Sequence, residues 1–146
     1  MASAPPDQTP ARPVYGAYDD AVIDFQNGTF VKLSPMDPEE LTAELAPLLV
    51  ADERILLAFK GMRDSLAFTD KRLISINVQG LTGKKRDYSS LPYNRVQAWS
   101  VETAGTFDLD AELELWFSGL GKVRLEFKGQ VDIRTIGRLV GDHVLG

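Results

Sequence analysis

The sequence predicts a mainly β domain, an antiparallel barrel or sandwich, with a helix at its C-terminal end. From residue 54 onward, short segments alternate apolar and polar residues, and turn signals separate them about every eight to twelve residues. Residues 131–146 then change to a helical period. The chain has 146 residues, 44% of them apolar and 25% charged, which suits one soluble domain with its own core.

Residues 1–36 are expected to form an N-terminal arm. Residues 1–14 hold four prolines and are typical of a flexible tail. Residues 21–33, AVIDFQNGTFVKL, place Asn27-Gly28 between two β-prone runs, which is the pattern of a type I′ hairpin turn. We expect this hairpin to add to an exposed sheet edge of its own domain or of a neighbouring subunit. The N-terminus has no secretory-signal pattern, so we expect a cytoplasmic protein.

A short amphipathic helix is predicted to follow the arm. Asp37 is the expected N-cap, Pro38 suits the first helical position, and Glu40 completes a capping box. An apolar stripe would pack the helix, and Pro47 should end or bend it, because proline lacks the amide hydrogen that a helix interior needs. The stripe consists of Leu41, Leu45 and Leu48.

Seven strands are predicted after this helix. In the third, Ile74, Ile76 and Val78 are expected to face the core, and Ser75 and Asn77 the solvent. The last two alternate most clearly, with acidic residues between apolar ones in the first and basic residues in the second. The seven segments are residues 54–61, 63–70, 72–79, 85–91, 96–103, 110–117 and 122–129.

A terminal helix is predicted after the strands. Asp132 is its expected cap, and an apolar stripe runs along one side. Two glycines inside the helix weaken it by about 1 kcal/mol each relative to alanine, so its stability should come from docking. We expect it to cover an open mouth of the barrel with Ile133, Ile136, Val140 and Val144.

The segment from residue 58 to residue 119 resembles the bacterial PH domain family. The strings FTDKRLI, QGLTGKK, SLPY, WSVETAG and FDLDAELELW carry this resemblance, in this order. It covers about residues 37–146, which we take as the domain. It implies a PH-like seven-stranded antiparallel split barrel capped by the C-terminal α-helix, with a short N-terminal helix. It also implies assembly into homo-oligomeric rings and no enzymatic activity, and it leaves residues 1–36 unexplained.

Charge is distributed unevenly along the chain. The net charge is −5, made up of −8 in residues 1–53, +6 in residues 54–95 and −3 in residues 96–146. The negative charge of the whole chain disfavours binding to nucleic acid and nonspecific attraction to anionic lipid. Any such binding would therefore have to come from the basic middle segment. The alternative is that segments of opposite charge face one another, within one chain or between chains.

Basic residues flank two of the predicted turns. The first and third turns of an antiparallel meander lie at the same end of the sheet, and strand alternation sends Lys85 to the opposite face from its neighbours. The resulting candidate site for an anion or lipid headgroup is Lys60, Arg63, Lys84 and Arg86. The alternative is that these residues form a solvated rim or pair with another subunit.

The acidic string DLDAELE, residues 108–114, is not a convincing cation site. Strand residues two apart lie about 6.5 to 7 Å apart along one face, which spreads the carboxylates too widely for one hard cation. The basic residues of the following strand are better partners. Trp116 should point outward, and Trp99 should share a face with Gln97 and Val101. The candidate oligomer interface is Trp99, Trp116, Asp110, Glu112, Glu114, Lys122 and Arg124.

No catalytic constellation is visible. The chain has no cysteine and one histidine, His143, whose place near the end of the last helix suits helix capping. We therefore expect no enzymatic activity, no cofactor and no metal. The favoured function is a non-enzymatic, self-assembling PH-like interaction or scaffold module that forms a homo-oligomeric ring and meets an unidentified protein partner. The alternative is a peripheral binder of anionic lipid headgroups at a membrane surface.

Overall fold

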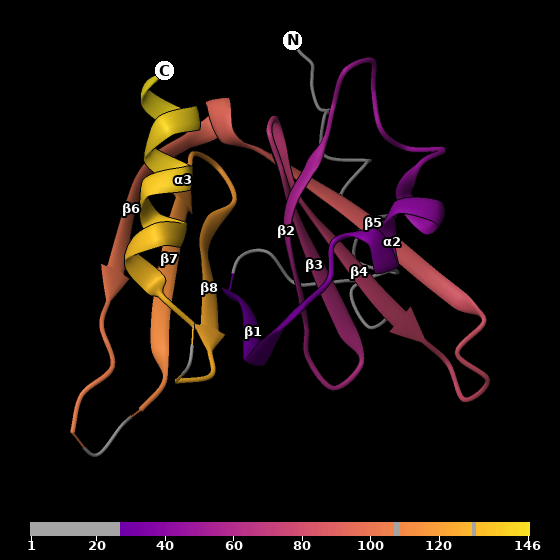
Figure 1. Cartoon of the computed structure of the whole chain (residues 1–146), viewed down its shortest axis with the longest axis horizontal. Helices are drawn as coiled ribbons and strands as arrows, with labels where there is room; N and C mark the ends of the chain where they lie inside the picture. The colour runs from indigo at the N-terminus through magenta and orange to yellow at the C-terminus, as the bar shows by residue number, and fades with distance from the viewer. Residues whose placement is uncertain (1–26, 107–108, 130) are drawn as a thin grey trace, which may run out of the picture.

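The computed structural model describes residues 27–106, 109–129 and 131–146. Its strands form one eight-stranded mixed sheet in the order β5-β4-β3-β2-β1-β8-β7-β6, which curls into two halves that face each other (Figure 1). The strands are β1 (Asn27–Met36), β2 (Ile55–Lys60), β3 (Asp64–Thr69), β4 (Arg72–Gln79), β5 (Lys85–Pro92), β6 (Val96–Glu102), β7 (Ala111–Phe117) and β8 (Gly121–Phe127). The helices are α2 (Glu39–Leu45), the 3₁₀ turn η1 (Tyr93–Arg95) and α3 (Ile133–Leu145).

All seven predicted strands and both predicted helices are confirmed, and they make a mainly β, PH-like fold. The main core lies between the two halves of the sheet and is closed by α3, whose Ile133, Ile136 and Val140 are buried in it. Asp132 caps α3 as expected, since its carboxylate accepts a hydrogen bond from the Arg134 amide.

The predicted turn at Asn27-Gly28 is wrong. Both residues lie inside β1, which pairs in parallel with β8 and antiparallel with β2, while residues 21–26 lie outside the described residues. A bulge between Phe30 and Leu33, with Lys32 at a φ of 56°, lets these two side chains, three residues apart, both enter the core. The segment forms a continuous strand and not a turn because its backbone pairs with the edges of β2 and β8.

The prediction that one face of β4 packs on the core and the other faces the solvent is also wrong, because this half of the sheet is covered on both faces. Ile74 and Ile76 pack under α2 in a second, smaller core, whereas Leu73 faces the main core. By alternation Ser75 shares the Leu73 face, and it is fully buried. A strand buried on both faces does not alternate in the simple manner that the sequence suggested.

α2 is held by the capping box that the sequence predicts. The Asp37 carboxylate accepts from the Glu39 amide at 3.0 Å, and the Glu40 carboxylate accepts from the Asp37 amide at 3.2 Å. Leu41 and Leu45 are buried in the smaller core. The helix ends at Leu45, so Leu48 lies beyond it and is 43% exposed, not part of the packed stripe.

Candidate functional site

Two hairpin turns meet at one end of the sheet, as the sequence predicts. The β2–β3 turn and the β4–β5 turn both lie at the lower margin of Figure 1. The Arg63 guanidinium donates to the Gly80 carbonyl at 2.7 Å, and the Val78 amide donates to the Arg63 carbonyl at 3.4 Å. Lys60 ends β2 and Lys84 precedes β5, and both are exposed. The structure therefore gathers both turns into one basic rim.

Arg86 is engaged elsewhere. It lies on the α2 face of β5, where its guanidinium donates to the Glu44 carboxylate at 3.0 Å. The Tyr88 hydroxyl donates to the same oxygen at 2.7 Å, and this hydrogen bond, with burial, raises the pKa of Tyr88. Lys85 falls on the opposite face by strand alternation, as expected. Arg86, one of the four predicted anion-site residues, is therefore not part of the rim and instead anchors α2 to the sheet.

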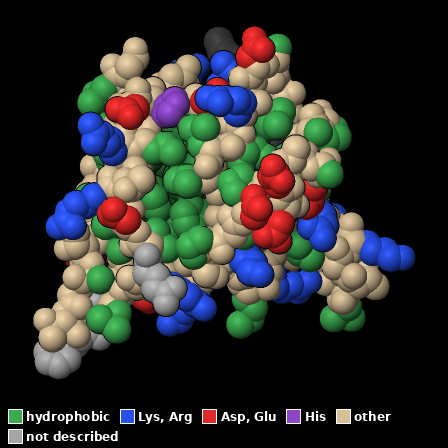
Figure 2. Space-filling model, viewed as in Figure 1, with side chains coloured by type: hydrophobic (Ala, Val, Ile, Leu, Met, Phe, Trp, Pro, Cys, Tyr) green, Lys and Arg blue, Asp and Glu red, His purple; other side chains and the backbone are tan. Residues whose placement is uncertain are grey.

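Apolar side chains stand at the two hairpin tips, a feature that the sequence analysis did not single out. Met62 is 98% exposed and Leu81 is fully exposed. Figure 2 shows hydrophobic side chains protruding at these two turns, with basic side chains beside them. Their signal in the sequence is an apolar residue directly after a turn glycine, in KGMR and QGLTG.

Near this rim, two acidic residues are half-buried at the base of the turns. Asp64 and Asp87 both pair in register with Asn77 of β4. Burial raises the pKa of the Asp64 carboxyl, and the neighbouring Arg63 charge partly opposes that effect. Asp64 directly follows Arg63 and lies one position nearer the turn than Ser65, the partner of Lys60, so this carboxyl stands among the cations of the first turn.

The outer face of β7 and β8 carries most of the predicted interface residues. The Arg124 guanidinium donates to both carboxylate oxygens of Glu112, and Lys122 lies 3.2 Å from Glu114. The hydrogen bond to Glu112 is the main reason that the pKa of Arg124 is raised. Trp116 is half-buried and pairs in register with Lys122 and Ala98. The cross-strand pairing predicted for the acidic ladder is therefore present within one chain.

The remaining two interface candidates lie apart from this face. Trp99 packs against the main core, beside Gly141 of α3, and pairs with core-facing Leu115. Asp110 lies just before β7, 3.9 Å from Lys32. The structure therefore places Trp116, but not Trp99, on an outward surface.

Two strands end the sheet. β5 pairs only with β4 and β6 only with β7 among the described strands, and the two strands lie on opposite flanks of the molecule in Figure 1. Their outer edges pair with none of the other described strands, and such an edge can take up a further strand.

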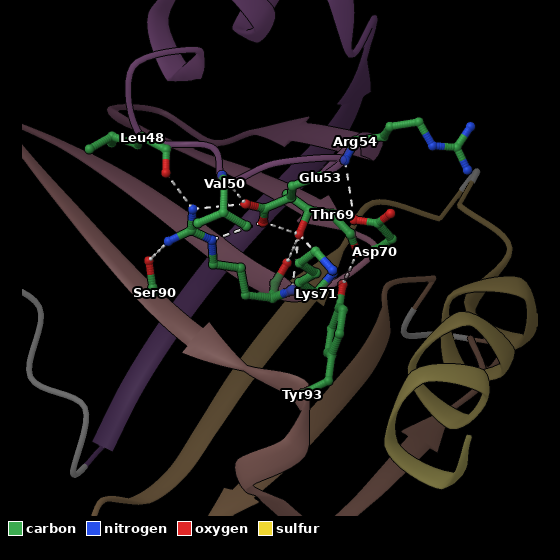
Figure 3. A network of polar contacts seen from close by, with 10 residues as sticks. Leu48, Val50, Glu53, Arg54, Thr69, Asp70, Lys71, Ser90 and Tyr93 are labelled. Atoms are coloured by element: carbon green, nitrogen blue, oxygen red, sulfur yellow. Dashed lines mark hydrogen bonds and ion pairs between the residues drawn. The ribbon is translucent and has the colours of Figure 1, made fainter.

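A buried ion pair organises the other end of the barrel (Figure 3). The Arg72 guanidinium donates to both carboxylate oxygens of Glu53, at 2.9 Å each, and also to the Leu48 carbonyl and the Ser90 hydroxyl. Burial by itself raises the pKa of Glu53, but hydrogen bonds from Arg72, Thr69 and the Val50 amide outweigh it and bring the pKa to about 2. Leu48, Val50 and Glu53 all belong to the loop between α2 and β2, so these hydrogen bonds hold that loop on β4.

A concave site of about 470 Å³ lies beside this network. Tyr93 and His143 line it with their ring centroids 5.1 Å apart, and burial raises the pKa of Tyr93. The His143 Nδ1 lies 2.8 Å from the Leu139 carbonyl, which is four residues back inside α3. The helix instead ends on a hydrogen bond from the Gly146 amide to the Asp142 carbonyl, so this contact is not the predicted cap. Within the described ranges, no group of three or more acidic, histidine or cysteine side chains could hold a metal ion.

No helix in the described part of the chain is long and apolar enough to cross a membrane.

The eight-stranded sheet with α3 closing its main core defines a protein of the pleckstrin-homology fold class. The family model described as "Bacterial PH domain" matches residues 24–144, and the chain belongs to this family. The match begins before residue 37, so it includes β1. The family description names no enzymatic activity.

Relatives and solved structures agree with this assignment. The chain is 42% identical over 118 residues to "Uncharacterized protein YjqA" of Bacillus subtilis, covering 80% of this chain and 94% of that protein. A crystal structure of a Shewanella loihica protein with a pleckstrin-homology domain has a TM-score of 0.70 at 41% identity, over 78% of this chain and 98% of that one. A pleckstrin-homology domain of Shewanella amazonensis has a TM-score of 0.60 at 46% identity, over 76% and 90% of the two chains.

Proposed function

We propose that this protein is a non-enzymatic PH-like module that assembles into a closed homo-oligomeric ring and presents its surfaces to a protein partner. The observation that carries the proposal is the pair of sheet edges, β5 and β6, on opposite flanks of one molecule. The chain runs in one direction along β5, turns at η1 and runs back in the opposite direction along β6. If a neighbouring copy has the same orientation, its β5 would therefore pair with β6 of the first copy as an antiparallel strand and extend the sheet. Such a head-to-tail contact is the kind that closes rings.

Charge at the two edges supports the same register. β5 begins with Lys85 and β6 ends with Glu102, and both side chains are exposed and form no ion pair with a described residue. Both positions lie away from η1, so they would meet at the same end of the proposed contact. Opposite charges placed in this way favour one register over a slipped one.

Light scattering after size exclusion tests the assembly. We expect a mass that is a fixed multiple, three or more, of 16.1 kDa at micromolar concentration. Glu102→Lys should place like charges at the contact and lower that mass, whereas Glu39→Lys, an equal charge change on the exposed side of α2, should not. A wild-type protein that is only monomeric at micromolar concentration would overturn the proposal.

A second candidate function is peripheral binding of anionic lipid headgroups, and the joined turns favour it. Three of its four predicted residues, Lys60, Arg63 and Lys84, lie at the two turns, while Arg86 is paired with Glu44. Near an anionic surface each basic residue contributes about 1 kcal/mol. Flotation with vesicles of phosphatidylglycerol at low salt should recover the protein, and reversing the three charges should abolish recovery. Recovery that does not respond to these reversals would reject the site.

A further inference from the structure

The two hairpin tips present one continuous surface, which we call the tip surface. It consists of four basic and two apolar side chains: Lys60, Arg63, Lys84, Lys85, Met62 and Leu81. The Arg63 guanidinium donates to the Gly80 carbonyl and the Val78 amide donates to the Arg63 carbonyl, which holds the two turns side by side (Figure 1). Met62 and Leu81 are the most exposed of the large hydrophobic side chains in the described part of the chain. The described residues therefore leave both tips uncovered.

Positive charge dominates the tip surface. None of its four cations forms an ion pair with a described residue. When the half-buried Asp64 and Asp87 at the base of the turns are included, the four positive and two negative groups sum to +2. The chain as a whole carries −5, so an excess of carboxylates lies elsewhere in it. Because charges are screened beyond about 10 Å at 0.1 M salt, a group that balances the tip surface must come close to it.

Residues 14–26, which we call the acidic segment, have a composition that complements this surface. Within them, YDDAVIDF, residues 18–25, contains three aspartates and no cation, and its other five side chains are apolar. Residues 1–26 sum to −3, from four aspartates and one arginine, and lie outside the described residues. Acidic residues on the outer face of the described sheet are already engaged, because Glu112 pairs with Arg124 and Glu114 with Lys122. The acidic segment is therefore the best source of a balancing charge within the chain.

The chain before β1 is long enough to reach the tip surface. β1 begins at Asn27, and seven residues later Ser34 pairs with Lys60 of the tip surface. Asp19 and Asp20 stand eight and seven residues before Asn27. An extended chain spans about 3.3 Å per residue, so a segment that folds back along β1 can bring both carboxylates to the level of Lys60. A tether of this length keeps the segment at an effective concentration on the order of millimolar, at which weak surface contacts are populated.

We propose that the acidic segment folds back and docks on the tip surface of the same molecule, with its aspartates on the cations and its apolar side chains on Met62 and Leu81. This inference goes beyond both functions proposed above and rests on neither. Docking combines charge attraction with the removal of two exposed apolar side chains from water. An external ligand of the tip surface must then displace the acidic segment, which acts as an intramolecular competitor.

The concave site beside Tyr93 suits the acidic segment less well. Its charged lining is balanced, since Arg72 pairs with Glu53 and the other two charges, Asp70 and Lys71, are opposite. A segment with three carboxylates gains no net attraction from such a lining. Charge therefore favours the tip surface over this site.

Zero-length crosslinking of the full chain tests the contact. A carbodiimide joins a carboxylate directly to an amine, so it records aspartate and lysine side chains that touch. Asp19 and Asp20 should couple to the lysines of the tip surface about threefold more often than to Lys71, because several exposed ion pairs together favour a contact only modestly. Lys71 is the matched control, since it is exposed, forms no ion pair with a described residue and lies in the β3–β4 turn at the other end of the barrel. Equal coupling to Lys71 would overturn the proposal.

Isotope mixing separates a contact within one molecule from a contact between copies. Unlabelled protein and protein labelled with heavy nitrogen are unfolded, mixed in equal amounts, refolded together and then crosslinked. The crosslinks should join peptides of the same isotope. Crosslinks that join the two isotopes as often as they join one would place the acidic segment on a neighbouring copy and would overturn docking within one molecule.

Acetylation rates measure how well the acidic segment covers the lysines of the tip surface. Deleting residues 1–23, which leaves β1 intact, should raise the rates at these lysines about threefold and leave the rate at Lys71 unchanged. Asp19→Asn with Asp20→Asn should produce most of the same increase. Rates that do not respond to the deletion would overturn the docking, and a response to the deletion but not to the two substitutions would overturn the role of the carboxylates.

Discussion

The Glu53–Arg72 pair shows how one buried charge can be stabilised in this small domain. The Glu53 side chain is completely removed from solvent, yet four hydrogen bonds reach its carboxylate, from Arg72, Thr69 and the Val50 amide. Removing one partner of such a pair is costly because the other charge stays buried and unpaired. Neither residue stands out in the sequence, since residues 53 and 72 meet only when β3 and β4 form.

Glu53 gives the folded state a defined pH dependence. Its pKa is about 2 in the folded protein against a usual 4.5, which is worth about 3 kcal/mol of folding free energy. Because the folded pKa is the lower one, this contribution is complete above pH 4.5 and is lost as the pH falls toward 2. At pH 7, Glu53→Gln should reduce the free energy of unfolding by about 3 kcal/mol.

Urea unfolding at pH 7 and at pH 3 checks this. The difference between wild type and Glu53→Gln should fall to roughly half by pH 3. Glu39→Gln, at an exposed residue, should change the free energy of unfolding by less than about 0.5 kcal/mol. A difference between wild type and Glu53→Gln that is constant with pH would contradict the lowered pKa.

At the scale of elements, α3 packs against β6 with two glycines on its contact face, and close approach accounts for one of them. A methyl group at Gly137 would come within 2.7 Å of a Val101 methyl, whereas one at Gly141 would meet the Trp99 ring at an ordinary 3.4 Å. The sequence indicated only that these glycines weaken the helix. The tertiary structure supplies a reason for the first of them, which is close approach to Val101.

Alanine at these two positions should therefore have opposite effects. Gly137→Ala should lower the free energy of unfolding by about 1 to 2 kcal/mol, because overpacking outweighs the gain in helix propensity. Gly141→Ala should leave stability unchanged or raise it by up to about 1 kcal/mol. Thermal unfolding of both variants measures this, and Val101→Ala should rescue Gly137→Ala. Equal effects of the two alanines would refute the close approach.

At the scale of the whole molecule, β1 joins the two halves of the sheet. It hydrogen-bonds to β2 on one side and β8 on the other, and it inserts Phe30 and Leu33 into the main core. Without it the sheet order would be interrupted between β2 and β8. Its contribution is therefore both backbone pairing and core volume.

Deleting residues 1–36 should abolish cooperative thermal unfolding followed by circular dichroism, because two sheet edges and a cavity would be exposed together. Val31→Ala, on the same strand but at a half-exposed residue, is the control and should cost less than about 1 kcal/mol. A deletion variant that unfolds at the wild-type midpoint would show that β1 is dispensable.

The sequence by itself determined the seven later strands, the capping box at Asp37 and the amphipathic α3, because each depends on alternation, helical period or capping chemistry within a few neighbouring residues. It also predicted that Lys60, Arg63 and Lys84 share one end, since an antiparallel meander requires it. Only the tertiary structure decided the path of Asn27-Gly28, the two-sided burial of β4 and the engagement of Arg86 by Glu44. Each of these three features depends on a long-range partner that no local pattern contains. The partners are, in the same order, a second sheet edge, a covering helix and a carboxylate 42 residues away.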